Sequence, residues 1–363
     1  MSEISLKYQP DFERVREAWN AYWAGEMLKR PLVVAHVPKS GVYENKTAHG
    51  YYHLVNHDVD AYLESVDAML EATWYMAESV PAFPPDFGPD QVAAFLGAEL
   101  EVSDDSKTTS WVDPIVDEDE WEEHLPLRID PNNKWYKAFL SVCERMREHA
   151  AGRYVVGTPD LHTNADALSA LRGTAGLCMD LFDCPEEIAR AMTDMRALYR
   201  PLFESIRTAC GKSLETGMIS WIPFWSEGKY AVVQCDFLAM IGPEQARAFA
   251  LPAIEEEAAY LDHCVFHLDG PDALRHLDDI LAIDAIDAVQ WVSGAGQKPM
   301  WQWTEVLQKI QAAGKGLQVW DITCDEVKQV HKELNPEGVV YCTKGMQSRS
   351  EVDDLCQWLE KHT

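Results

Sequence analysis

Eight short apolar runs separated by longer amphipathic stretches constrain the fold more than any other feature of this sequence. They span residues 31–37, 79–87, 153–161, 217–225, 263–269, 287–292, 316–322 and 338–344. Continuous apolar runs of this length are typical of strands that are buried on both faces of a parallel sheet. Eight such strands alternating with helices predict an α/β protein, a (β/α)8 TIM barrel formed by a single domain over residues 1–363. An open doubly wound sheet is the alternative, although no glycine-rich turn of the kind usual in that fold follows the first run.

Two regions depart from the regular alternation of strands and helices. Residues 1–30 predict an N-terminal helix that packs on the barrel, because apolar residues recur at spacings of three and four: Phe12, Val15, Trp19, Tyr22 and Trp23. Pro31 ends this pattern. The stretch near residues 97–152 carries extra material, which we interpret as an insertion over the barrel mouth.

Sequence signals also mark where some helices begin. Thr323 with Glu326, and Ser348 with Glu351, have the spacing of capping boxes. Pro271 occupies the first position of another helical pattern, where its missing N–H is not needed. We therefore expect helices to start at these three places.

The chain is strongly acidic, with 31 Lys and Arg against 60 Asp and Glu and a formal net charge of −29. Such a charge gives no electrostatic reason to bind nucleic acid or an anionic membrane, and we expect neither as a partner. No apolar stretch approaches the ~18 residues of a membrane span, and the N-terminus lacks a secretory pattern. The nine cysteines are scattered and odd in number, which is typical of reduced thiols. We therefore expect a cytoplasmic protein.

Polar and aromatic side chains gather where the predicted strands end, which is where barrels of this type carry their chemistry. They are His36, Asp160, His162, Trp221, Trp225, Glu227, His267, Asp269, Gln290, Trp291, Trp320, Asp321 and Cys342. This mixture predicts a wet cavity with apolar walls. We predict catalytic roles for four acid–base groups, namely Asp160, His162, Glu227 and Asp321. We predict substrate contacts for Trp221, Trp225, Trp291 and Gln290, with plain core packing as the alternative for the tryptophans.

His267 and Asp269 close the fifth run, in the sequence HLDGP. Alternate residues of a strand share a face, so the imidazole and the carboxylate point the same way at the end of this strand. Two interpretations stay open: a hydrogen-bonded structural pair, or two ligands of a metal ion. Earlier in the chain, Cys235 is more typical of core packing, and Asp236 of either a helix cap or a substrate contact.

Three segments of the second half resemble the uroporphyrinogen decarboxylase superfamily: FHLDGP at 266–271, AVQWVSGAG at 288–296 and VVYCTK at 339–344. The resemblance spans roughly residues 215–363, with weaker support from DALSALRG at 166–173 and from GEMLKRP near the N-terminus. It implies a (β/α)8 barrel, in agreement with the eight runs. The decarboxylases of this superfamily carry an arginine-rich segment near their start, whereas the matching region PLVVAHVPKSGVYE contains no arginine. This difference argues against decarboxylation of an octa-acid.

The other branch of the superfamily holds corrinoid-dependent methyltransferases, which bind zinc through a His-x-Cys pair after strand 5 and a cysteine after strand 8. By this resemblance, His267 matches the histidine and Cys342 lies where the second thiolate belongs, while Asp269 stands where the first cysteine would be. Because a carboxylate donates less electron density than a thiolate, such a set would leave Zn²⁺ a stronger Lewis acid. The hypothesis is therefore a zinc-dependent methyltransferase that takes a methyl group from a small O- or N-methylated substrate.

The resemblance also implies partners. The methyl group would pass to a corrinoid on a separate protein, because the chain lacks the cobalamin-binding pattern Asp-x-His-x-x-Gly. A homodimer is a further expectation, since the superfamily often forms dimers. Two other functions stay open: a metal-free lyase or hydrolase that uses paired carboxylates at the barrel mouth, such as Glu227 with Asp269, and a barrel that only binds a ligand.

Overall fold

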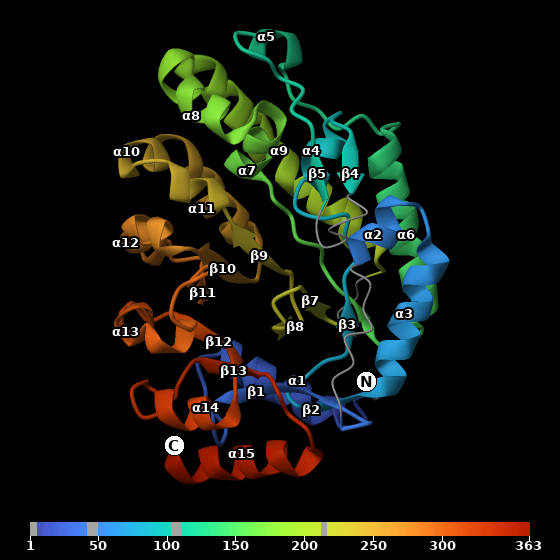
Figure 1. The fold of residues 1–363 in the computed structure, drawn as a ribbon, viewed down its shortest axis with the longest axis vertical. Coiled ribbons are helices and arrows are strands. Elements are labelled where there is room, and N and C mark those ends of the chain that lie inside the picture. Colours follow the sequence, from blue (N-terminus) through green and yellow to red (C-terminus); the bar gives the residue numbers. More distant parts are fainter. Residues whose placement is uncertain (1–5, 42–49, 103–109, 212–215) are drawn as a thin grey trace.

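A seven-stranded sheet forms the centre of the computed structural model, which describes residues 6–41, 50–102, 110–211 and 216–363 (Figure 1). The strand order is β2-β1-β13-β12-β11-β10-β9, and every neighbouring pair is parallel except β1 with β2. The bounds are β1 (Leu32–Pro38), β2 (Thr73–Ala77), β9 (Tyr230–Gln234), β10 (His263–Asp269), β11 (Ala288–Val292), β12 (Gly316–Ile322) and β13 (Val339–Thr343). The predicted α/β class, with a mostly parallel sheet at its centre, is confirmed.

Six shorter strands form three separate pairs: β3 (Ala82–Phe83) with β6 (Val155–Val156), β4 (Leu100–Val102) with β5 (Ser110–Val112), and β7 (Met218–Ile219) with β8 (Trp225–Ser226). A hydrogen bond from Thr158 N to Ile219 O links the segment after β6 to β7, and β7 in turn contacts β9. The ladder is broken here, because residues 79–87 contain three prolines, which lack a backbone donor. Within the described residues, a closed barrel is therefore not detected.

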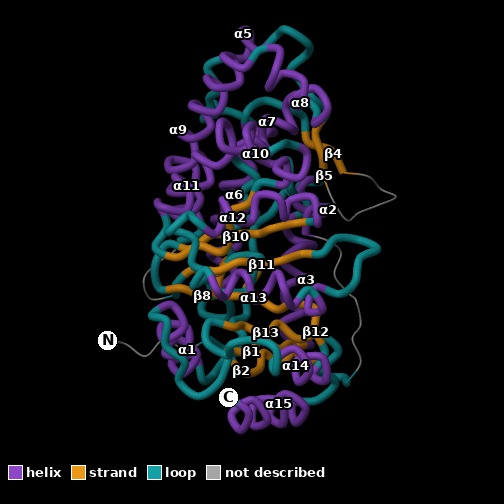
Figure 2. The backbone as a smooth tube through the Cα atoms, turned by 90° about the vertical axis from the view of Figure 1, so that its left-hand side faces the viewer, coloured by secondary structure: helices purple, strands orange, loops and turns teal. Residues whose placement is uncertain are grey.

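Helices cover the outer face of the large sheet and build a second region above it. The α-helices are α1 (Phe12–Trp23), α2 (Gly50–Val55), α3 (Val59–Ala72), α4 (Gln91–Phe95), α5 (Trp121–His124), α6 (Lys134–Ala150), α7 (Asn164–Arg172), α8 (Thr174–Asp183), α9 (Pro185–Ala209), α10 (Pro243–Gln245), α11 (Leu251–Tyr260), α12 (Leu277–Leu281), α13 (Thr304–Ala312), α14 (Cys324–Val330) and α15 (Arg349–His362). Shorter helical turns are η1 (Asp236–Met240), η2 (Ala246–Ala250), η3 (Pro271–His276) and η4 (Met300–Gln302). Figures 1 and 2 show α12, α13 and α14 along the outside of strands β10 to β13. None of the described helices has the length and apolar character needed to cross a bilayer.

The capping signals of the sequence act as predicted. At the start of α14 the Thr323 side chain accepts a hydrogen bond from Glu326 N. The Glu326 side chain in turn accepts one from Thr323 N, which completes a capping box. The Ser348 side chain accepts from Glu351 N at the start of α15. These contacts satisfy backbone N–H groups that a helix start otherwise leaves unpaired.

The N-terminal helix α1 lies within the predicted range and packs where the strands of the large sheet begin. Trp19 is fully buried and donates a hydrogen bond to Glu78 O at 3.0 Å. Trp23 stacks on the ring of His263, the first residue of β10, with the ring centres 4.3 Å apart. Since α1 covers the amino-terminal ends of these strands, their carboxyl ends stay available on the opposite side.

One predicted strand differs from the structure. The strand next to β10 is β9, all of whose five residues are buried, and not the predicted run 217–225, which forms the β7–β8 hairpin. The predicted insertion near residues 97–152 contains β4, β5, α5 and α6, and α6 packs against α4 and α9.

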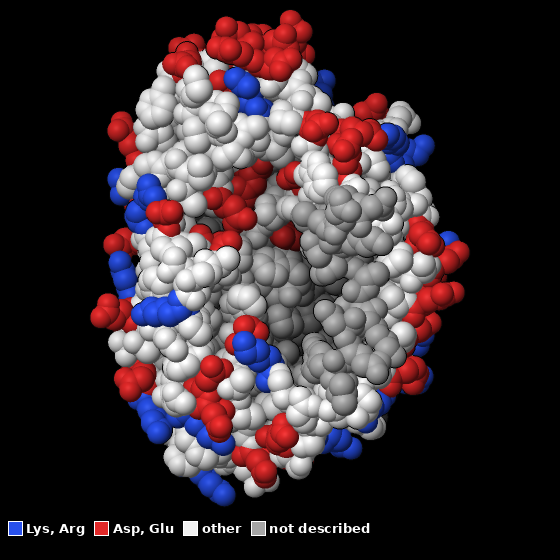
Figure 3. All heavy atoms as spheres, viewed as in Figure 1, with Lys and Arg blue, Asp and Glu red and all other residues white. Residues whose placement is uncertain are grey.

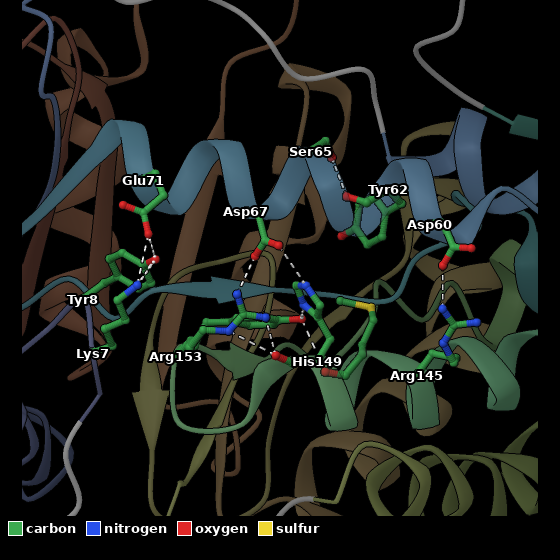
Figure 4. A network of polar contacts seen from close by, with 12 residues as sticks. Lys7, Tyr8, Asp60, Tyr62, Ser65, Asp67, Glu71, Arg145, His149 and Arg153 are labelled. Carbon is green, nitrogen blue, oxygen red and sulfur yellow. Dashed lines mark hydrogen bonds and ion pairs between the residues drawn. The ribbon is translucent and has the colours of Figure 1, made fainter.

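Ionic contacts along α3 hold this helix against its neighbours, as Figure 4 shows. Three of its carboxylates pair with basic side chains of neighbouring segments: Glu71 with Lys7 at 3.0 Å, Asp67 with Arg153 at 2.5 Å and His149 at 3.2 Å, and Asp60 with Arg145 at 2.5 Å. Exposed pairs of this kind contribute about 0–1 kcal/mol each. They therefore orient α3 and α6, while the apolar core supplies most of the stability.

Candidate functional site

Four polar side chains lie in one row across the large sheet. In the strand register His267 of β10 is paired with Gln234 of β9 and with Gln290 of β11, and Gln290 is paired with Gln318 of β12. Residues in register on neighbouring strands share a face of the sheet. The glutamines are buried, which places hydrogen-bonding groups in an otherwise apolar layer.

Hydrogen bonds connect this row to residues beyond it at both ends. At one end Gln234 Nε2 donates to Asp160 Oδ1 at 2.9 Å. At the other end His267 Nδ1 contacts Gln290 Oε1, Gln290 Nε2 donates to Gln318 Oε1 at 2.5 Å, and Gln318 Nε2 donates to Cys342 Sγ at 3.2 Å. The row thus lies between the carboxylate of Asp160 and the thiol of Cys342, with His267 in its middle.

Asp236, His267 and Asp269 form a group that can hold a metal ion. One ligand atom from each of the three lies within 4.8 Å of the others. Asp236 follows β9 and Asp269 ends β10, and since these strands are parallel neighbours their carboxyl ends meet. Asp269 Oδ1 is buried and has no hydrogen-bond partner among the described residues. A buried carboxylate oxygen left unpaired is costly, so the group fits a divalent cation such as Zn²⁺, which accepts imidazole and carboxylate ligands.

Cys342, the predicted third ligand, lies outside this group, and Asp236 takes its place. It lies on β13, three strands away from β10 in the sheet, and hydrogen bonds connect it to His267 through the two glutamine amides. Burial raises the pKa of the Cys342 thiol to about 12, so without a metal contact it stays protonated at neutral pH. Because a bound metal ion itself deprotonates a coordinating thiol, the position of Cys342 outside the group of three ligand atoms, and not its pKa, separates it from the metal-site candidate.

Three charged side chains in the segment that follows β6 form an ion triplet, which supports the metal-site candidate. His162 Nε2 lies 3.1 Å from Asp160 Oδ2, and His162 Nδ1 lies 3.4 Å from Asp166 Oδ2. Burial opposes the charge on the imidazole, but the two carboxylates outweigh it and hold the pKa of His162 well above its usual range. The Asp166 carboxylate also accepts hydrogen bonds from Asp236 N at 3.0 Å and Phe237 N at 2.9 Å. The triplet therefore anchors η1, which carries Asp236.

Two carboxyl groups that interact with the ion triplet have raised pKa values. Burial, and then the charge of Asp160, raise the pKa of Asp86 to about 8. Asp86 follows β3, and its Oδ1 accepts a hydrogen bond from Gly88 N at 2.8 Å. Asp236 is exposed as a whole residue, but the protein around its carboxyl group removes part of the water. This desolvation, and then the charge of Asp166, raise the pKa of the carboxyl group to about 6. At neutral pH, Asp86 thus holds a proton beside the ionised Asp160, whose pKa His162 lowers against the effect of burial.

A cavity of about 460 Å³ adjoins His267. Among its lining residues are the predicted site residues Trp221, Gln290, Asp321, Cys342 and His267. The Trp221 and His267 rings meet edge to face at 5.0 Å, and Asp321 is paired with Lys344 at 2.6 Å. Trp221 Nε1 is buried without a hydrogen-bond partner among the described residues. These walls are mostly neutral, as a cavity for a small organic molecule requires.

Figure 3 shows a hollow on the face that is seen in Figure 1, with carboxylate side chains along part of its wall. A larger cavity of about 930 Å³ lies elsewhere, with lining residues from α1, β2 and α15. None of the three residues of the metal-site candidate lines this larger cavity. His267 lines the smaller cavity, whereas Asp236 and Asp269 do not, and we place the functional site by its chemistry at His267, where the metal-site candidate and this cavity meet.

Asp160, His162 and Asp269 do not line the smaller cavity, and three other predicted site residues lie elsewhere in the fold. Glu227 precedes β9, at the amino-terminal side of the sheet, and forms an ion pair with Arg16 of α1. Trp225 is fully buried against Phe12 of α1, with the ring centres 5.6 Å apart. Trp291 follows Gln290 and so points to the other face of the sheet, where it packs against Trp303 at 5.4 Å.

The sequence matches no protein-family model and no curated protein. Sixteen solved chains match the structure, and one of them is a methyltransferase from Methanosarcina mazei. The match covers 96% of this chain and 98% of that chain, with a TM-score of 0.59 and 10% sequence identity. At this identity the likeness shows a shared fold, so the candidate site has to carry any argument about chemistry.

Proposed function

We propose that this protein is a metal-dependent methyltransferase that binds Zn²⁺ through Asp236, His267 and Asp269. It takes a methyl group from a small O- or N-methylated substrate and passes it to a corrinoid held by a separate protein. The observation that carries the proposal is the unpaired buried oxygen of Asp269 within a group of three ligand atoms. The fold shared with a methyltransferase supports the reaction class.

A Zn²⁺ ion at this group would act as a Lewis acid that polarises the atom bearing the methyl group. The residues around it have their own tasks. The neutral cavity beside His267 would receive the rest of the substrate, and Trp221 forms part of its wall. When the methyl group leaves an oxygen, the product needs a proton, and Asp86 holds one beside Asp160. The ion triplet of Asp160, His162 and Asp166 keeps η1 in place.

The closed barrel, the cellular location and the homodimer that the sequence predicts remain part of the proposal. We infer a (β/α)8 barrel, supported by the contacts that run from β3 to β6, from β6 to β7 and from β7 to β9. We also retain a cytoplasmic location and a homodimer as expectations. A dimer is tested by light scattering of the purified protein at several concentrations.

Metal analysis of the purified protein tests the proposal. We expect about one zinc per chain after soaking with Zn²⁺ and gel filtration. The Asp236→Asn and Asp269→Asn variants should lose the zinc, whereas Cys342→Ser should keep it. Loss of zinc from Cys342→Ser with retention in Asp236→Asn would restore the thiol as the ligand and refute our set.

The reaction itself is tested with free cob(I)alamin, whose absorbance changes when it accepts a methyl group. A panel of methyl ethers and methylated amines supplies the donors. Methylation that requires both the donor and zinc supports the proposal. No methylation with any donor, in a protein that holds its zinc, contradicts it.

A second candidate function is a metal-free lyase or hydrolase that uses two carboxyl groups. The predicted pair of Glu227 and Asp269 does not come together, because Glu227 pairs with Arg16 beside α1. Asp86 and Asp160 are the pair that favours this function, since one is protonated and the other ionised at neutral pH. Release of CO₂ or of a hydrolysed product by zinc-free protein would support it, with loss of that activity in Asp160→Asn.

A further inference from the structure

We propose that the row of side chains from Cys342 to His267 is a positioning device. It fixes the His267 tautomer with the proton on Nδ1, so that Nε2 is free to bind the metal ion. The metal part of this inference rests on the proposed function. The tautomer itself does not, because hydrogen bonds within the chain determine it.

The direction of the hydrogen bonds runs from the imidazole to the thiol. A glutamine amide has a donor end and an acceptor end, so the orientation of one amide sets the orientation of the next. Gln318 Nε2 donates to Cys342 Sγ at 3.2 Å, which turns Gln318 Oε1 toward Gln290. Gln290 Nε2 donates to that oxygen at 2.5 Å, which turns Gln290 Oε1 toward His267. A carbonyl oxygen only accepts, so His267 Nδ1 must carry the proton.

The reversed direction would give the opposite tautomer. It needs the Cys342 thiol as the first donor, and an S–H group is a weak one. It would also turn the NH₂ group of Gln290 toward His267 Nδ1, which would then have to accept and so carry no proton. The proton would lie on Nε2 and block that atom as a ligand. The two directions are therefore distinguished by the position of one proton.

The fold keeps the row in place. His267, Gln290 and Gln318 are paired in register on three parallel strands, and their main chains hold each other through the sheet. Gln290 is 5% exposed and Gln318 is 2% exposed, so water does not compete for their amides. Cys342 is thus the acceptor at the end of the row, which gives this predicted ligand a different role.

Nitrogen NMR of the histidine rings in the zinc-free protein tests the tautomer directly, because protonated and unprotonated ring nitrogens have well separated ¹⁵N shifts. The His267→Gln variant assigns the signals. We expect a protonated Nδ1 and an unprotonated Nε2. A protonated Nε2 in the wild-type protein overturns the proposal. The expected tautomer in a protein that binds no zinc would leave this inference intact and refute the proposed function.

Variants at Gln318 test the role of the row without touching His267. Gln318→Met removes the acceptor for Gln290 at similar volume, whereas Gln318→Glu keeps an acceptor there. We expect mixed tautomers and about a tenfold loss of zinc affinity for Gln318→Met, and near wild-type behaviour for Gln318→Glu. Unchanged tautomer and affinity in a folded Gln318→Met protein overturn the proposal, and the wild-type spectrum decides if that variant does not fold.

Discussion

Replacing Glu257 of α11 should change how the stability of the protein depends on pH. This side chain is 2% exposed and pins the loop that carries Asp160 and His162: Thr163 Oγ1 donates to its Oε1 at 2.6 Å, and Asn164 Nδ2 donates to its Oε2 at 3.2 Å. Burial raises the pKa of the Glu257 carboxyl from 4.5 to about 8, against the effect of these two hydrogen bonds. The folded protein therefore holds a proton on this group through a pH range in which the unfolded chain has lost it.

The sign of the effect follows from that proton. Between pH 4.5 and 8 the folded state binds one proton more than the unfolded state at Glu257, so this group lowers the free energy of unfolding as pH rises. At about 1.4 kcal/mol for each pH unit, the whole window amounts to about 5 kcal/mol at most. Glu257→Gln cannot ionise. Its free energy of unfolding, minus that of the wild type, should therefore rise steadily with pH through this window.

Urea unfolding at a series of pH values measures this difference. Glu256→Gln is the matched control, since Glu256 is the preceding residue of the same helix but is exposed and paired with Arg196. We expect the control to differ from the wild type by less than about 1 kcal/mol at every pH. A difference between Glu257→Gln and wild type that stays constant from pH 4.5 to 8 would refute the reasoning.

Three further predictions concern single contacts. Asp166→Ala removes one carboxylate from His162 and both hydrogen bonds to η1. It should lower the pKa of His162 in an NMR titration and destabilise the protein by about 3–5 kcal/mol. A melting temperature equal to that of the wild type would contradict a stabilising role for the triplet. Glu227→Gln breaks a half-exposed pair with Arg16 away from the cavity, so zinc content and methyl transfer should not change, and a large loss of activity would return Glu227 to the site. Thr323→Ala removes the cap of α14 and should cost about 1 kcal/mol in urea unfolding, with no cost if the box contributes nothing.

The sequence predicts the continuous strands well and the interrupted ones poorly. Strands β1 and β10 to β13 lie within or very close to the predicted runs, because a buried parallel strand needs an unbroken apolar stretch. The run 217–225 is also apolar, but Pro223 interrupts it and the chain folds back as the β7–β8 hairpin. Which of two neighbouring runs pairs with β10 depends on packing across the whole sheet, so the apolar pattern alone does not identify β9.

The sequence likewise identifies some residues of the candidate site and not others. His267, Asp269, Asp160 and His162 could be found because each closes a strand or follows one directly. Asp236 gains its role as a candidate ligand only because β9 lies beside β10, which the sequence pattern does not state.

Two other parts of the site depend on distances between segments far apart in the chain. The raised pKa of Asp86 comes from burial and from Asp160, which lies 74 positions later in the sequence. Cys342 has the right position along its strand, but the spacing between β10 and β13 is filled by Gln290 and Gln318. Trp225 and Glu227 lie at the other end of the sheet from the predicted one, because they precede β9 and do not end a strand of the large sheet.

Anomalous X-ray diffraction from a crystal soaked in Zn²⁺ tests the central claim most directly. We predict one strong zinc peak with Asp236, His267 Nε2 and Asp269 as its ligands, at the distances of about 2.0–2.2 Å usual for nitrogen and oxygen. A peak bound to Cys342 Sγ without Asp236, or no peak at this group in a crystal that takes up zinc elsewhere, would contradict the account.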